Sequence, residues 1–319
     1  MKSTNTQCDP TWAVIVAFFP NADRLDELVR RLLEQVKSVV VYDNGGADNR
    51  SLHMPNVHIL GSGQNVGIAS ALNRSIEHAI SNGARYIVTF DQDSCPSRVL
   101  IRGLRAHLDN FSESNIAAVG PTCFDVRNGH FTWPVFAPAP YGFRRVNPDL
   151  KSDPIPSIFL ITSGMMFDVE RFKQVGPFDD SLFIDHVDTA WGLRANAMNL
   201  RLLTCPDVRM KHELSRSAPR RVLGRLVLDY PPIRRYYTAR NSIRLALSSF
   251  TPLGLRFYFV ATTMYRLMVL PMFDATPGAC FRAIVKGIGH GVLEGGIAPS
   301  CTSLAMESRI QGKGRPDLR

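Results

Sequence analysis

Short apolar runs alternate with segments of helical periodicity over the first 120 residues. The apolar runs are rich in Val and Ile, which is typical of buried strands, and they occupy 11–19, 38–46, 56–63, 86–93 and 116–121. Between them, apolar residues recur at helical spacing over 21–36, 65–83 and about 97–109. This alternation predicts an α/β fold of βαβ units, with a mostly parallel central sheet flanked by helices.

The pattern changes after Pro121. Pro, Gly and aromatic residues over 122–157 predict hairpins and loops, and the apolar run at 158–167 predicts a strand. Residues 176–199 pass from a loop into a helix that would turn Val187, Ala190, Leu193 and Ala197 toward the core, and a last strand follows at 200–206. We therefore expect one α/β domain over 1–225, with a nucleotide-binding half at 11–121 and an acceptor half at 122–225, followed by a helical, basic and apolar region at 226–319.

Composition and charge narrow the class of partner. The 319 residues are 45% apolar and 20% charged, as in an ordinary folded protein, and the net charge of +9 is concentrated in the C-terminal third. This bias favours nucleic acid, an anionic membrane or a phosphorylated ligand, although a solvated basic surface explains it equally well. The stretch 255–273 carries Arg256 and Arg266. It suits an interfacial helix on an anionic membrane or a helix packed on the main domain.

Cysteine spacing and the N-terminus predict the compartment. The six cysteines form no CxxC pair, so neither a zinc site nor a disulfide framework is expected. The apolar run after Met1 is short and is broken by Pro20, unlike a signal peptide, and no run reaches the roughly 20 apolar residues of a membrane span. We expect an intracellular protein with reduced thiols.

Polar residues gather where the predicted strands end. In open parallel sheets, ligands bind at the carboxyl edge of the strands. Asp43, Asn44, the Gly61–Gly63 turn, Asp91 and Asp93 all follow strands. They predict a nucleotide site, although neither GxGxxG nor a Walker P-loop is present.

Asp91 and Asp93 have the spacing of side chains on the same side of a strand. Their Cα atoms would lie roughly 6.5–7 Å apart in a fully extended strand, so both need not grip one ion. Mg²⁺ takes one or two carboxylates and completes its shell with water and phosphate oxygens. We expect Asp93 on a metal and Asp91 on sugar hydroxyls or a metal-bound water. The alternative is that Asp93 or Ser94 caps the next helix.

A second acidic pair, Asp185 and Asp188, has i, i+3 spacing and would share a helical face. One of the two is a candidate general base, and the alternative is that both stabilise a helix start through its dipole. His186 between them would point elsewhere.

Basic and aromatic residues follow the last predicted strand. His212 is a candidate metal or diphosphate ligand, and Lys211 a candidate phosphate contact, although a lone histidine is more often structural. Further along, bases and rings alternate in a way that suits a diphosphate or a sugar, or simply a basic helix face. These residues are Arg234, Arg235, Tyr236, Tyr237, Arg240 and Asn241.

Taken in order, seven blocks resemble those of bacterial rhamnosyltransferases of the inverting glycosyltransferase family 2, which have the GT-A fold. The resemblance covers about 11–245, and the rest more loosely. The blocks are VIVAFFP, VVVYDNGG, NVGIASALNRSIEHA, FDQDS, SGMMF, FIDHVDTAWGLRA and RRYYTARN.

The resemblance implies roles for particular residues. Asp43 would contact the nucleotide base, and Asn65 and Gly67 would line its pocket. Asp91 and Asp93 would hold Mg²⁺ or Mn²⁺ and the donor diphosphate. Asp188, six residues before Arg194, would be the catalytic base, with Asp185 as the alternative. His212 would be the late histidine that lies near the metal. Arg240 would contact the donor. Family members often carry a second acid two residues after the base, where this chain has Ala190.

The implied reaction moves L-rhamnose from dTDP-L-rhamnose to a saccharide hydroxyl in surface polysaccharide synthesis. The acceptor would be linked to undecaprenyl diphosphate, and the enzyme would work in the cytoplasm or peripherally at the inner membrane face, with no nucleic-acid partner. Two alternatives remain: the same fold using another donor such as a UDP-hexose, and a non-catalytic protein that binds sugar nucleotides or polyanions.

Overall fold

The computed structural model describes residues 10–46, 52–110, 115–125, 131–140, 142–212, 220–222, 225–227, 230–274 and 276–299. Of the six cysteines, Cys8 and Cys301 lie outside these ranges, and the other four are free thiols.

The predicted βαβ units are present and build residues 11–121, the half expected to bind the nucleotide. Four parallel strands, in the order β3-β2-β1-β4, form one side of a nine-stranded sheet. The strands are β1 (Thr11–Ala17), β2 (Ser38–Asp43), β3 (Val57–Gly61) and β4 (Tyr86–Asp91). The helices of this half are α1 (Ala22–Leu33), α2 (Ile68–Ser81) and α3 (Leu100–Asn110). Every residue of β1 and β2 is buried, which explains their unbroken apolar sequences.

The second half of the sheet mixes directions. β10 (Met165–Asp168) runs antiparallel between β4 and β5 (Ile116–Asp125), and β11 (Arg201–Lys211) is parallel to β5. The short strands β9 (Ile155–Ser157) and β6 (Phe131–Thr132) pair with β11 and β5. The α/β class with a mostly parallel sheet is thus confirmed, and the reversed strand lies at its centre.

Two predicted strands have other bounds. Only the end of the strand expected at 158–167 is a strand, because β10 begins at Met165. Residues 158–164 form a connection between β9 and β10 that turns at Gly164, where φ is +83° and a side chain would lie 2.7 Å from the Pro121 ring. Apolar residues at 158–162 belong to a packed loop, which an apolar run does not distinguish from a strand. The strand expected at 200–206 continues to Lys211, because a register shift between Cys205 and Arg209 absorbs Pro206.

The remaining elements up to residue 227 are short. They are the hairpin β7 (Val135–Ala139) and β8 (Gly142–Val146), η2 (Pro148–Leu150), α4 (Val169–Val175), η3 (Asp180–Leu182), α5 (Val187–Ala197), and the hairpin β12 (Arg220–Val222) and β13 (Arg225–Val227).

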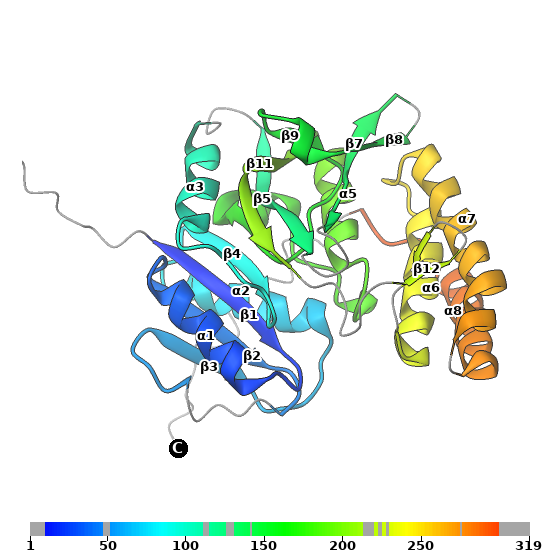
Figure 1. The fold of residues 1–319 in the computed structure, drawn as a ribbon, viewed down its shortest axis with the longest axis horizontal. Coiled ribbons are helices and arrows are strands. Elements are labelled where there is room, and N and C mark those ends of the chain that lie inside the picture. Colours follow the sequence, from blue (N-terminus) through cyan, green and yellow to red (C-terminus); the bar gives the residue numbers. More distant parts are fainter. Residues whose placement is uncertain are drawn as a thin grey trace, which may run out of the picture.

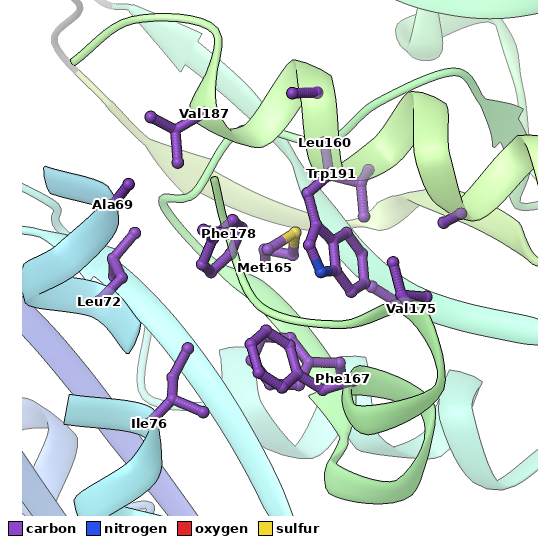
Figure 2. Close-up of a cluster of buried hydrophobic side chains, with 14 of the residues drawn as sticks. Ala69, Leu72, Ile76, Leu160, Met165, Phe167, Val175, Phe178, Val187 and Trp191 are labelled. Carbon is purple, nitrogen blue, oxygen red and sulfur yellow. The ribbon is translucent and has the colours of Figure 1, made fainter. Parts of the chain in front are cut away.

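A dense aromatic core anchors α5 on the sheet. Trp191 is fully buried against Phe167, Phe172 and Phe178, and its indole N–H donates to the Gly176 carbonyl at 2.8 Å. Figure 2 shows Phe178 between Trp191 and the apolar residues Ala69 and Leu72 of α2. Val187, Ala190 and Leu193 face this core as predicted, whereas Ala197 is exposed at the end of the helix. The first turn of α5, which carries Asp188, is therefore held by rigid packing.

The C-terminal region is helical, as expected for its described residues. Its elements are α6 (Pro232–Leu247), α7 (Leu253–Val269), η4 (Leu270–Phe273) and α8 (Pro277–Glu294). They stand together at the end of the molecule opposite β1, β2 and β3 (Figure 1). α8 lies so close to α6 that a side chain at Gly287 would come within 2.4 Å of the Tyr236 carbonyl oxygen. Residues 300–319 of the predicted region lie outside the described residues.

Candidate active site

A cavity of about 380 Å³ opens where β1 and β4 end. Segments far apart in the sequence line it: the residues after β4, the loop before α2, the start of α5, the end of β11, and Tyr230 with Arg234 at the start of α6. Its position at the carboxyl edge of the sheet is the one expected for a ligand site in an open α/β fold.

Three side chains converge at the end of β4. One ligand atom from each of Asp91, Asp93 and His212 lies within 4.8 Å of the others. Asp91 ends β4, and the backbone N–H of Ser94 donates to its carbonyl at 3.1 Å, so the chain turns and returns Asp93 to the same point. His212 directly follows β11, and its backbone N–H donates to the Phe124 carbonyl at 3.0 Å. The turn after Asp91 removes the separation expected of an extended strand.

These three residues fit a divalent cation. Two carboxylates and an imidazole are hard and borderline donors of the kind that Mn²⁺ and Mg²⁺ accept. The Nε2 atom of His212 lies 3.6 Å from Asp91 Oδ2, and its buried Nδ1 has no hydrogen-bond partner among the described residues. The helix-cap alternative for Asp93 and Ser94 is wrong, because α3 begins only at Leu100 and the Ser94 hydroxyl bonds the Ser163 hydroxyl.

Amide side chains organise the loop next to this cluster. Asn44 accepts from the Val66 N–H at 2.8 Å and donates to Asn65 Oδ1 at 3.2 Å, while Asn65 Oδ1 also accepts from the Gly67 N–H at 3.0 Å. Asn44, Asn65 and Gly67 line the cavity. Asp43, expected on the base, is buried just behind them at the end of β2 and accepts from the Gly45 N–H at 3.1 Å.

Position 67 requires glycine because of its backbone conformation and because Phe183 lies close to it. Its φ is +82°, and a side chain there would lie 2.9 Å from the Phe183 carbonyl oxygen. We expect Gly67→Ala to displace the segment leading to the second acidic pair and to lower kcat/KM for the donor roughly 10–100-fold. Gly83→Ala is the matched control: its φ is +84° and the space around it is open, so it should cost about 1 kcal/mol of stability without changing the kinetics. Equal kinetic losses in both variants, measured at saturating acceptor, would contradict this role.

The second acidic pair does not share a helical face. α5 begins only at Val187, and Asp185 precedes it in the left-handed region with φ of +62°. Asp185 accepts from Arg234 at 2.9 and 3.1 Å and from the Thr238 hydroxyl at 2.8 Å. Its carboxylate is thus committed to α6.

Asp188 is in a different environment. It lies in the first turn of α5, lines the cavity, and accepts from the Thr189 N–H at 2.6 Å through Oδ1. Burial raises the pKa of Asp188 to about 6; the Thr189 N–H opposes this shift, and the negative charge of Asp91 adds to it. A carboxylate whose pKa is raised in this way is a stronger base than an exposed one.

Arg240 does not reach the cavity, which corrects the expectation that it contacts the donor. It is buried between helices, where it bonds the Asn241 side chain at 3.0 Å and the Ser181 carbonyl, and it lies 3.7 Å from Glu294. Arg234, six residues earlier, lines the cavity instead. Residues 234 and 240 lie on different sides of α6 because they are six positions apart. The sequence does not show which of these sides faces the cavity.

Two further lining residues went unassigned in the sequence. The Thr162 hydroxyl donates to Asp91 at 3.3 Å from the loop before β10, and Gln92 accepts from the Phe18 N–H at 2.6 Å and donates to its carbonyl at 3.1 Å. Neither carried a signal in the sequence. His186 bonds the Ser242 hydroxyl at 3.0 Å, and burial lowers its pKa to about 4, so it is a neutral support for the α5–α6 contact.

The parallel strands β3-β2-β1-β4 and the acidic cavity at their carboxyl edge have the architecture of the GT-A fold. Residues 13–172 match the model of the glycosyl transferase family 2. The chain is 33% identical over 246 residues to the dTDP-rhamnosyl transferase RfbF of Shigella flexneri, a match covering 76% of this chain and 81% of the relative. The chain therefore belongs to glycosyltransferase family 2.

Solved structures show the same fold. GalNAc-T7 with UDP, GalNAc and Mn²⁺ matches 90% of this chain with a TM-score of 0.58 at 14% identity, and this chain spans 58% of that structure. S. aureus TarS 1–349 in complex with UDP-GlcNAc matches 97% of this chain and 94% of its own, with a TM-score of 0.52 at 13% identity. At these identities the likeness shows the GT-A architecture alone, and the enzyme class rests on the family.

Proposed function

We propose that this glycosyltransferase moves L-rhamnose from dTDP-L-rhamnose to a saccharide hydroxyl with inversion at the anomeric carbon. The observation that carries the donor assignment is the 33% identity to a dTDP-rhamnosyl transferase over three quarters of the chain. The sequence blocks that resemble the family include residues that line the cavity, among them Asn65, Asp91 and Asp188. The nucleoside would lie along Asp43, Asn65 and Gly67, and the diphosphate beside Asp91 and Asp93.

Asp188 is the proposed general base. Its carboxylate lines the cavity and has only Thr189 as a hydrogen-bond donor among the described residues, whereas Asp185 is occupied by Arg234 and Thr238. In the proposed step, Asp188 accepts the proton of the acceptor hydroxyl as that oxygen forms a bond to the anomeric carbon. The bond from that carbon to the diphosphate oxygen breaks, and both electrons leave with the nucleoside diphosphate.

Asp91, Asp93 and His212 would hold a Mg²⁺ or Mn²⁺ ion. When bound there, the cation neutralises charge on the departing diphosphate. Thr162 orients Asp91 through its hydroxyl, and the Phe124 carbonyl fixes the backbone that carries His212. Arg234 lies on the same cavity wall and, while paired with Asp185, gives that wall a second positive group for the phosphates.

The raised pKa of Asp188 predicts an acidic limb in the pH profile. Below about pH 6 the carboxyl is protonated and cannot accept the hydroxyl proton, so kcat/KM for the acceptor should fall about tenfold per pH unit below that point. The measurement is a set of initial rates from pH 4.5 to 8, taken with saturating donor and cation. A rate that stays constant down to a pH near 4.5 would show that no group with this pKa acts as the base.

A donor panel tests the proposed function. The chain is incubated with dTDP-L-rhamnose, UDP-glucose and GDP-mannose, together with synthetic saccharides on an undecaprenyl-diphosphate or short-chain analogue, and released nucleoside diphosphate is measured. We expect turnover of dTDP-L-rhamnose alone. Turnover of UDP-glucose without dTDP-L-rhamnose would overturn the donor and keep the enzyme class.

The acceptor and the division of the chain are part of the same proposal. We propose that the acceptor is a lipid-linked saccharide used at the inner face of the plasma membrane. We also propose that 1–225 forms the catalytic domain and that 226–319 extends it. Arg234 and Thr238 of α6 bond Asp185 beside the cavity, so the extension supports the site directly.

A further inference from the structure

One side of α7 and η4 is apolar and uncovered. Leu253, Phe257, Val260, Met268 and Met272 are all exposed, with Phe257 at 68%, Met268 at 73% and Met272 at 74%. Their spacings of four, three, eight and four residues place them on one side of the helix. The opposite side is packed, because Leu255 and Phe259 are buried in the main core.

The two arginines of this stretch lie off the apolar side. Arg256 donates to the carbonyls of Thr251 and Ser249 at 2.8 and 3.1 Å, and Arg266 is partly buried, with its pKa lowered by loss of solvent. The two expectations for 255–273 thus each describe one side of the same helix: one side packs on the main domain, and the other is open.

The open apolar surface continues beyond α7. Leu253 and Phe257 share a groove of about 610 Å³ with Pro138, Pro140 and Phe250 near the β7–β8 hairpin. Contiguous apolar surface of this kind on a folded chain marks a docking site for an apolar partner.

The outer side of α8 adds positive charge. Its inner side packs on α6 through Gly287 and Gly291, which leaves Phe281, Val285 and Val292 exposed together with Arg282 and Lys286. No described acidic side chain pairs with either cation. The acids in this region are engaged elsewhere, since Asp274 pairs with Arg235 at 3.3 Å and Glu294 lies 3.7 and 3.6 Å from Arg240 and Arg244.

Charge decides between two occupants for this surface. In a symmetric contact with a second copy, the same patch meets itself, so Arg282 and Lys286 would face like charges without an acid to offset them. An anionic lipid surface complements both features: apolar side chains enter the boundary of the acyl chains, and cations reach the headgroups. No helix in the described part of the chain has the length and apolar character to cross a bilayer, so the contact would lie in the plane of the surface.

We propose that the outer sides of α7, η4 and α8 form a docking surface for an anionic bilayer. The apolar side chains of α7 and η4 enter the boundary of the acyl chains, and Arg282 and Lys286 provide selectivity for anionic headgroups. Docking itself requires neither donor nor transfer. Its consequence, that the cavity is held near a lipid-linked acceptor, rests on the proposed function.

Vesicle flotation of the full chain tests the surface. We expect binding to phosphatidylcholine vesicles that contain phosphatidylglycerol, little binding to phosphatidylcholine alone, and weaker binding as NaCl is raised. Arg282→Gln and Lys286→Gln should each lower the partition coefficient roughly fivefold, as expected for one cation near an anionic surface. Phe257→Ser with Met268→Ser should lower it about tenfold or more, because exposed apolar area no longer enters the lipid.

Matched controls are available on the same chain. Lys37→Gln and Arg102→Gln each remove one exposed positive charge from the opposite half of the molecule, and Leu150→Ser removes an apolar side chain that is 78% exposed on η2. These controls should leave partition unchanged, and circular dichroism with thermal unfolding confirms that each variant is folded. The proposal is overturned if the wild-type chain does not float with anionic vesicles or if the controls lose binding equally. It is also overturned if the lipid-free chain is a dimer that Phe257→Ser dissociates. Because the flotation experiment uses no donor sugar, its result does not depend on the outcome of the donor panel.

Discussion

Asp188→Asn should lower kcat by about 10²–10⁴-fold while leaving donor affinity largely intact. An amide keeps the size of the side chain and its place in the first turn of α5, but it cannot accept the proton of the acceptor hydroxyl. Donor affinity should persist because Asn65, Gly67, Asp91 and Asp93 are untouched. Initial rates of nucleoside diphosphate release, combined with calorimetric binding of dTDP, separate the two effects.

Asp207→Asn is the control for this substitution. Asp207 is exposed and pairs with His107 at 2.9 Å, so its loss should leave the rates unchanged. A non-catalytic binder would show no difference between the two variants. Full activity in Asp188→Asn combined with its loss in Asp185→Asn would move the base to Asp185.

Chelation of divalent cations should remove activity by about 10²-fold or more, since a cation on a departing diphosphate contributes several kcal/mol. Adding Mn²⁺ or Mg²⁺ in excess of the chelator should restore it. Asp93→Asn and His212→Ala should weaken Mn²⁺ binding directly, because each removes one ligand atom from the cluster. Calorimetry with Mn²⁺ alone measures this without substrate.

His107→Ala is the matched control for His212→Ala. His107, in the last turn of α3, bonds the exposed carboxylate of Asp207 on β11, outside the metal cluster, and its loss should leave Mn²⁺ binding unchanged. Full transfer activity in the presence of excess chelator would rule out the metal role of the cluster.

The fold of residues 11–121 was predictable because its elements are local. β1, β2 and β4 are buried on both faces, so their sequences are continuous apolar runs, and α1 and α2 carry apolar stripes of helical period. The fold of residues 122–225 was less predictable. The 158–164 connection is apolar because it is packed under α5, and only the backbone at Gly164 shows that the chain turns there.

The sequence predicted the position of a site residue well where nearby residues determine it, and poorly where distant residues determine it. The convergence of Asp91 and Asp93 with His212 depends on a tight turn and on the end of β11, and strand spacing captured it only in part. The roles of Asp185 and Asp188 could not be separated in sequence, because the partner that occupies Asp185 is Arg234, 49 residues away. The same long-range packing places Arg234 at the cavity and buries Arg240. The resemblance to the family identified the blocks, and the orientations within them needed the structure.

The most direct test of the account is the anomeric configuration of the product made from dTDP-β-L-rhamnose. NMR of the purified product should show an α-linked L-rhamnosyl residue, as a single displacement assisted by Asp188 requires. A β-linked product would mean retention through two displacements and would contradict both the inverting mechanism and the role of Asp188 as base.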